Sequence, residues 1–183
     1  MISFLEQCLR DDIVYKLLPP NYDSSCNRLT LVEPQNESKP GKLAEVSIDE
    51  VPSSVLVLIG DKTKDYPLFK DEKAKYFGIY RKCDYLILME NYVLFIELKS
   101  SEEDVLTKFK AATCMFSYLQ AVAKYFGNQT TCHYEHKYIL LYNTPHKQPT
   151  RQSSVKEETS DIFEVYTQNL AFIPTISISD LIK

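Results

Sequence analysis

The chain has 183 residues, of which 44% are hydrophobic and 25% are charged, a balance that is typical of one globular domain with a buried core. The formal net charge of −4 excludes a global positive field for nucleic acid, so any such binding would depend on a local patch. Five scattered cysteines without a CxxC pair, and no uncharged apolar run near the roughly 20 residues of a membrane span, predict a cytoplasmic protein that does not enter a membrane.

The N-terminal part of the sequence predicts one helix followed by strands. Apolar residues recur at helical spacing over residues 3–18, and Pro19 and Pro20 end this pattern. Residues 54–59 are rich in β-branched and aliphatic side chains and predict a strand. A short strand is predicted at 28–32, residues 45–51 are ambiguous, residues 61–75 predict a loop, and residues 76–80 predict a short strand.

Residues 84–99, DYLILMENYVLFIELK, form the most informative segment of the sequence. Two apolar runs separated by two polar residues are typical of two strands joined by a tight turn. Because side chains alternate along a strand, Glu97 and Lys99 are expected on one face, with Asp84 at the mouth of the neighbouring strand. Two carboxylates and a lysine thus converge at the edge of an apolar sheet, where charges are costly unless they are paired or bind a metal.

A long amphipathic helix is predicted to follow this segment. Apolar residues recur at three- and four-residue steps from Leu106 to Phe126, after a capping box at Ser100 and before a C-terminal stop at Gly127. Residues 138–142 predict a strand, residues 157–169 a helix and residues 170–178 a last strand. This order predicts an α/β domain with a central mixed β-sheet and flanking helices.

The order of elements and the charged triplet together resemble the PD-(D/E)xK nuclease superfamily. The motif would be Asp84, twelve intervening residues and then Glu97-Leu98-Lys99, with Cys83 where the motif has proline. The resemblance covers about residues 55–143. It implies a restriction-endonuclease-like core with a helix, an antiparallel three-stranded meander, a crossover helix and a fourth strand. Residues 1–183 would be a single nuclease-like domain with additions at both ends.

This resemblance implies a metal-dependent nuclease that hydrolyses phosphodiester bonds in DNA, or else in RNA, with Mg²⁺ or Mn²⁺ as cofactor. Asp84, Glu97 and the backbone carbonyl of Leu98 would be the metal ligands, and Lys99 would lie beside the attacking water. Small nucleases of this kind often belong to restriction, mobile-element or anti-phage defence systems. A protein partner or a homodimer is therefore expected.

Five further residues extend the hypothesis. Some branches of the superfamily place a glutamate near the metal, for which Glu45 or Glu6 is a candidate. The exonuclease-type branch carries a glutamine on the helix after the core, where this chain has Gln120. Lysines near the motif are candidate contacts to nucleic-acid phosphates, namely Lys82 and Lys108.

Two other interpretations stay open at this point. The chain could be a nuclease-fold subunit that scaffolds or regulates a nucleic-acid-processing complex without cutting. Alternatively, Glu97 and Lys99 could form an ordinary ion pair at a sheet edge, with Asp84 starting a turn, in a plain α/β binding module. Affinity for Mg²⁺ or Mn²⁺ distinguishes the nuclease from the scaffold, whereas a plain binding module predicts two carboxylates that lie far apart.

Overall fold

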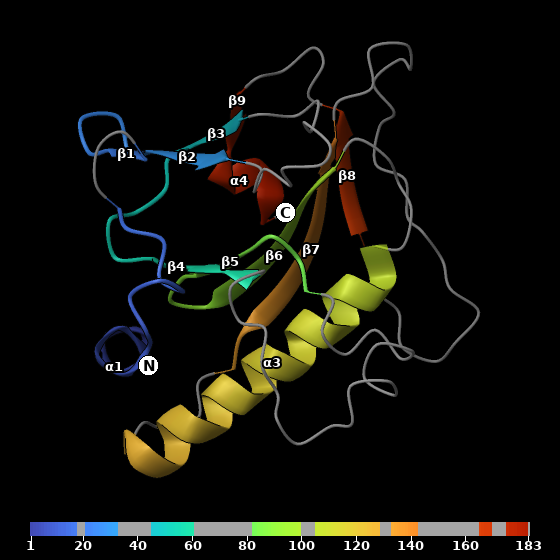
Figure 1. Ribbon diagram of the computed structural model, residues 1–183. Coiled ribbons are helices and arrows are strands. Elements are labelled where there is room, and N and C mark those ends of the chain that lie inside the picture. Colours follow the sequence, from blue (N-terminus) through green and yellow to red (C-terminus); the bar gives the residue numbers. More distant parts are fainter. Residues whose placement is uncertain are drawn as a thin grey trace.

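Three layers of secondary structure form the fold (Figure 1), in a computed structural model that describes residues 1–17, 21–32, 45–60, 82–99, 105–128, 133–142, 165–169 and 175–182. A five-stranded sheet lies in the middle. One of its faces is covered by α1 (Ile2–Cys8) and α3 (Val105–Phe126), and the other by a four-stranded sheet with the short helix α4 (Ile178–Leu181). The chain is thus a mixed α/β protein, as the sequence predicts.

The central sheet has the strand order β4-β5-β6-β7-β8. Its first three strands are an antiparallel meander, whereas β7 runs parallel to β6 and β8 runs parallel to β7. The helix α3 makes the crossover connection that a parallel pair such as β6 and β7 needs. The strands are β4 (Leu56–Ile59), β5 (Tyr85–Leu88), β6 (Tyr92–Lys99), β7 (Glu135–Tyr142) and β8 (Val165–Asn169).

Strands β5 and β6 are apolar on both faces because both faces are covered. Along β6, Val93 and Phe95 pack in the cluster with α1 and α3, while Leu94, Ile96 and Leu98 pack in the cluster with the second sheet. A strand buried on both faces reads as a continuous apolar run rather than as an alternating one. The polar residue Glu97 interrupts this run on the face that α3 covers.

The second sheet covers the other face with an alternating pattern. Its order is β1-β2-β3-β9, with β9 parallel to β3 and the other pairs antiparallel. Leu29, Leu31, Val46 and Ile48 point into the core, and the residues between them are partly or fully exposed. The strands are β1 (Tyr22–Asp23), β2 (Arg28–Val32), β3 (Glu45–Asp49) and β9 (Thr175–Ser177).

The N-terminal helix is shorter than predicted. It ends at Cys8, where the next residue, Leu9, has extended backbone angles (φ −81°, ψ 150°). The chain then turns, and Val14 forms an isolated bridge with Leu58 at the edge of the central sheet. The Tyr15 N–H also donates a hydrogen bond of 2.8 Å to the Val57 carbonyl. The apolar residues after the turn therefore extend the sheet edge instead of continuing the helix.

The predicted helix at the C-terminal side is wrong where the structure describes it. Residues 165–169, VYTQN, form β8 because they pair with the exposed edge of β7, and tertiary pairing overrides a weak helical pattern. The strands predicted at 28–32, 54–59, 84–98 and 138–142 are confirmed, as is the long helix. The loop and strand predicted over 61–80, and the capping box at Ser100, lie outside the described residues.

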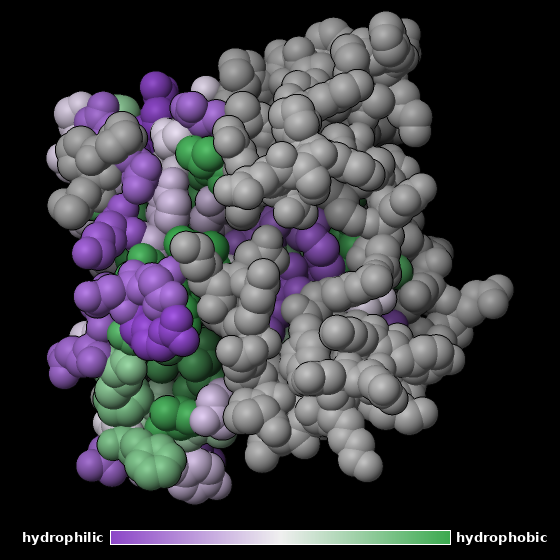
Figure 2. Space-filling model, viewed as in Figure 1, coloured by the Kyte–Doolittle hydropathy of each residue, from purple (hydrophilic) through white to green (hydrophobic). Residues whose placement is uncertain are grey.

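Helix α1 packs against the C-terminal end of α3. A Cβ atom added to Gly127 would lie 2.8 Å from the ring of Phe4, so a glycine lets the two helices approach closely here. Figure 2 shows hydrophobic side chains gathering on the surface at this corner, where Phe126 is 79% exposed. In the described part of the chain, no helix has both the length and the apolar character to cross a membrane.

Candidate functional site

The two carboxylates of the motif lie opposite each other at the end of adjacent strands. Tyr85 pairs with Ile96, and the same register sets Asp84, just before β5, against Glu97 in β6. Residues opposite each other in an antiparallel pair project from the same face of the sheet. The Leu98 N–H donates a hydrogen bond of 2.7 Å to Oδ2 of Asp84. This bond fixes the Asp84 carboxylate beside the backbone that follows Glu97.

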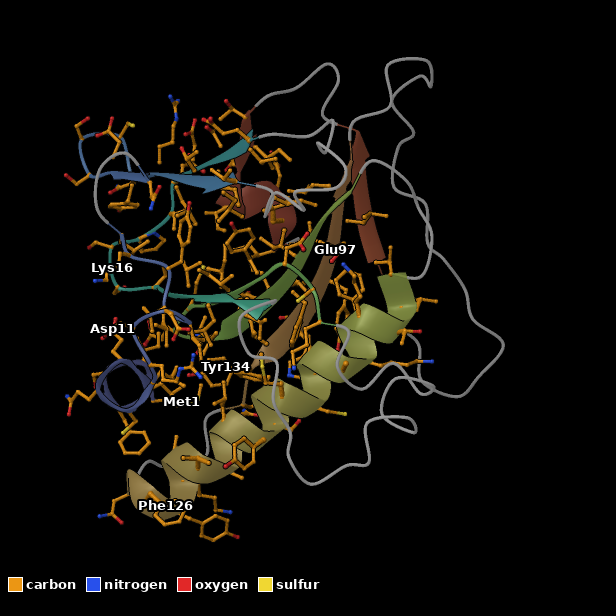
Figure 3. All side chains as sticks on the ribbon, viewed as in Figure 1. Met1, Asp11, Lys16, Glu97, Phe126 and Tyr134 are labelled. Carbon is orange, nitrogen blue, oxygen red and sulfur yellow. The ribbon has the colours of Figure 1, made fainter. Side chains whose placement is uncertain are left out.

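Both carboxylates are almost completely buried. Asp84 is 5% exposed and Glu97 is 1% exposed. Figure 3 labels Glu97 on β6, near the N-terminal end of α3. Carboxylates at this depth must be compensated by cations or hydrogen-bond donors, because burying an isolated charge costs far more than one interaction returns. The pair is therefore the strongest concentration of buried negative charge in the described core.

A close approach of β4 holds the chain just before Asp84. The Gly60 N–H donates a hydrogen bond of 2.8 Å to the Asp84 carbonyl. A Cβ atom at Gly60 would lie only 1.8 Å from the carbonyl oxygen of Cys83. A glycine is required at this position because any side chain would push the backbone of Cys83 and Asp84 away from β4.

Lys108, in the first turn of α3, is a cation in contact with Glu97. Its Nζ atom lies 2.5 Å from Oε1 of Glu97, and its side chain is 24% exposed, against 1% for the side chain of Glu97. The Lys108 ammonium thus reaches the buried carboxylate from the helix layer. The sequence hypothesis gave this lysine a role at phosphate, whereas in this structure it forms an ion pair with the proposed metal ligand.

The pKa of the Cys83 thiol depends on the charges of the site. Burial raises the pKa of the Cys83 thiol well above its usual value of 9.0, the negative charges of Glu97 and Asp84 raise it further, and Lys108 lowers it. The protonated thiol donates to the carbonyl of Tyr85 at 3.3 Å. Cys83 is therefore a buried, unreactive thiol beside the carboxylates. Glu97 and Asp84 raise its pKa by more than Lys108 lowers it.

The structure describes the side chain of Lys82 but not that of Lys99. Lys82 is 1% exposed, which does not match the surface position expected of a contact to phosphate. A buried ammonium needs a compensating partner in the fold. The backbone of Lys99 ends β6 in register with Tyr142, but its side chain lies outside the described parts.

The structure does not bring the predicted accessory residues to the carboxylates. Glu45 is an exposed residue of β3, in the sheet that covers the opposite face of the central sheet. Gln120 lies on α3, but twelve residues beyond Lys108, which is about 18 Å along a helix. Glu6 is exposed on α1. Sequence spacing could not reveal these separations, because they depend on which sheet and which helical turn each residue occupies.

Sequence reasoning missed a polar chain on the same face of the sheet. The Tyr138 hydroxyl lies 3.0 Å from Oγ1 of Thr113 and 3.3 Å from Nδ1 of His136. Because the Thr113 hydroxyl donates to the Phe109 carbonyl, Tyr138 donates to Thr113, and Nδ1 of His136 is the donor to Tyr138. Burial and the neighbouring His133 lower the pKa of His136. The i, i+2 spacing of His136 and Tyr138 in a strand was the available signal.

An aromatic cluster surrounds this polar chain on the face of the central sheet that α3 covers. The ring of Tyr138 stacks on Phe95 at a centroid distance of 5.0 Å, and Phe95 meets Phe116 edge to face at 6.1 Å. Since Phe95 precedes Glu97 by two residues on the same face, these rings form an apolar floor beside the carboxylate. A low-polarity floor strengthens each charge interaction above it.

The described residues contain no group of three or more histidine, cysteine, aspartate and glutamate side chains arranged to hold a metal ion. In the described residues, the candidate site consists of two buried carboxylates, with Lys108 in contact with Glu97 and the Leu98 N–H in contact with Asp84. Comparison of the chain with protein-family models, with curated proteins and with solved structures finds no match.

Proposed function

We propose that this protein is a metal-dependent nuclease that hydrolyses phosphodiester bonds in DNA, with Mg²⁺ or Mn²⁺ as its cofactor. One observation carries the proposal. Two buried carboxylates, Asp84 and Glu97, face each other at the ends of adjacent strands, and the Leu98 N–H holds one of them in place. A structural ion pair needs one acid, whereas two acids on one face at this depth favour a cation-binding role.

The chemistry of the donor set supports a hard divalent cation. Mg²⁺ takes oxygen ligands, and proteins usually hold it with one or two carboxylates while water and substrate phosphate complete the shell. The Leu98 N–H faces Asp84, and in an antiparallel ladder the N–H and C=O of one residue point toward the same neighbour. The Leu98 carbonyl is therefore a suitable third oxygen beside Asp84 and Glu97.

Each residue of the triplet has a separate task in the proposed reaction. When bound, the metal would neutralise charge on the scissile phosphate and make a water molecule a better nucleophile. Asp84 and Glu97 hold the cation, and the hydrogen bond from Leu98 orients Asp84. Lys99 follows Glu97 by two residues in the sequence of β6, and in the proposed reaction its ammonium would orient the attacking water and stabilise developing negative charge.

The topology of the central sheet supports the same proposal. An antiparallel meander leads through a long crossover helix to a strand parallel to the third, which is the order expected of a PD-(D/E)xK core. The net charge of −4 gives the chain no general attraction to nucleic acid. We therefore propose that a protein partner or a second copy of the chain contributes to substrate binding, as in a restriction or defence system.

The proposal is tested by incubating the purified protein with plasmid, linear duplex, single-stranded DNA and RNA in Mg²⁺, Mn²⁺ or EDTA. We expect metal-dependent cleavage that Asp84→Asn and Lys99→Ala reduce by about a hundredfold or more. Lys110→Ala, an exposed lysine on α3, is the matched control and should cut normally. Cleavage at the wild-type rate by Lys99→Ala would contradict the assigned role of this lysine.

A second candidate function is a subunit of the same fold that does not cut. The observation that favours it is the contact between Glu97 and Lys108, since an ion pair already neutralises the proposed metal ligand. Calorimetric titration with Mn²⁺ separates the two functions. Absence of binding together with absence of cleavage on all four substrates would favour the non-cutting subunit.

A further inference from the structure

We infer that the Lys108 ammonium is an internal competitor of the divalent cation at Glu97, so that metal binding displaces this lysine from the carboxylate. The inference rests on the metal site of the proposed function and deepens it, because it names the residue that sets how readily the site is loaded. In the unloaded protein, Lys108 acts on metal binding through its contact with Glu97.

The geometry of the contact is the first reason. The Nζ atom lies 2.5 Å from Oε1 of Glu97, so a positive group already occupies one approach to the carboxylate. Two cations on one small anion repel each other strongly in a poorly solvated site, whichever of the two oxygens the metal takes. Lys108 in its observed place therefore weakens binding of a cation at Glu97.

The unequal burial of the two partners is the second reason. Glu97 is fixed, because it is 1% exposed and lies on β6 between β5 and β7. Lys108 has a flexible four-carbon stem at the first turn of α3, and its side chain is already 24% exposed. A lysine can turn its head to water while its stem stays against the protein. The exchange thus needs a rotamer change of Lys108 and no movement of the sheet.

After the exchange, Lys108 would be placed to contact a phosphate group of the substrate. The released ammonium stays on the first turn of α3, a few ångströms from a site that binds an anionic substrate together with its metal. Lysine is a compact positive charge that suits a phosphate group. The same side chain would then neutralise Glu97 in the unloaded protein and contact the substrate in the loaded one.

The direct test is calorimetric titration of Mn²⁺ into the metal-free wild type, Lys108→Met and the control Lys110→Met. Methionine keeps the apolar stem of the lysine and removes its charge. We expect Lys108→Met to bind Mn²⁺ about tenfold more tightly than the wild type, and Lys110→Met to bind it as the wild type does. Equal or weaker binding by Lys108→Met would overturn the inference and leave the metal site intact. Absence of binding by every protein would overturn the metal site itself.

A second measurement uses only the wild type and so does not depend on whether Lys108→Met folds. Lysines of the intact protein are acylated with a limiting amine-reactive reagent, with and without saturating Mn²⁺, and each site is quantified by peptide mass spectrometry. We expect Mn²⁺ to raise the reactivity of Lys108 several-fold relative to Lys110, which serves as the internal reference. An unchanged ratio, in a protein whose Mn²⁺ binding calorimetry has established, would overturn the displacement.

Discussion

The ion pair between Glu97 and Lys108 should be asymmetric, so that losing the lysine costs more stability than losing the acid. Replacing Lys108 by methionine takes a hydrogen-bonded cation away from a carboxylate that is 1% exposed. Removing one partner of a buried pair costs about 3–5 kcal/mol when nothing else compensates the remaining charge. Because Glu97 has further interactions in the fold, we expect a smaller loss, of about 2–3 kcal/mol.

Replacing Glu97 instead takes this contact away from the Lys108 ammonium, but that ammonium can turn to solvent. In Glu97→Gln the remaining ammonium belongs to a side chain that is 24% exposed and can turn to water. The glutamine keeps the shape of the side chain and one acceptor oxygen, so the expected loss is about 1 kcal/mol. For a chain of this size, a loss of 2–3 kcal/mol lowers Tm by about 4–12 °C, whereas 1 kcal/mol lowers it by about 2–4 °C.

The assay is urea-induced unfolding of the metal-free proteins at pH 7, followed by circular dichroism, with thermal melts beside it. Lys110→Met controls for removing a lysine from the same helix, and its stability should change by less than about 0.5 kcal/mol. Equal losses in Lys108→Met and Glu97→Gln, or a larger loss in Glu97→Gln, would refute the argument that the acid is the immobile partner.

Three other expectations concern the surroundings of the site. Gly60→Ala should lower stability by about 1–3 kcal/mol or more in urea unfolding, because its Cβ would meet the Cys83 carbonyl, and a wild-type midpoint would contradict that close approach. The raised pKa of the Cys83 thiol and its burial predict that native protein at pH 8 is alkylated at the exposed Cys114 but not at Cys83, which peptide mass spectrometry would show. Burial lowers the pKa of His136, so the proton binds more readily to the unfolded chain and stability should fall as the pH drops below about 6.5. His136→Phe, which keeps an aromatic ring in the cluster, should flatten that fall, and an unchanged pH dependence would rule out this histidine as its source.

The helices and strands that could be predicted from sequence are those whose own apolar residues form a clear run or a periodic stripe. The run from Tyr92 to Leu98 is apolar enough to be a strand in any context, and the stripe along α3 has helical periodicity over six turns. Residues 13–15 and 165–169 were predicted as helix because their apolar residues fit a helical pattern locally. Their partners, β4 and β7, are remote in sequence, and only the tertiary pairing makes them extended.

In the candidate site, too, the features set by local sequence could be predicted and those set by tertiary packing could not. Strand alternation and a tight turn predict that Asp84 and Glu97 converge at the end of neighbouring strands, and the register of β5 and β6 sets the two residues opposite each other. The contact from Lys108 depends on how α3 lies across the sheet, and the burial of Lys82 depends on what covers the end of β5. Neither is encoded in a spacing, so both lysines were predicted only as candidate contacts to nucleic acid.

The turn between β5 and β6 controls the geometry of the carboxylate pair from five residues away. The Met89 N–H donates a hydrogen bond of 2.9 Å to the Tyr92 carbonyl, which closes the hairpin and sets the register along the whole pair. A slip of one residue would move every side chain of β6 to the other face of the sheet. Glu97 would then lie in the apolar layer between the two sheets, away from Lys108, and Leu98 would face α3. The same short turn therefore determines which residues form the core and whether the two acids lie opposite each other.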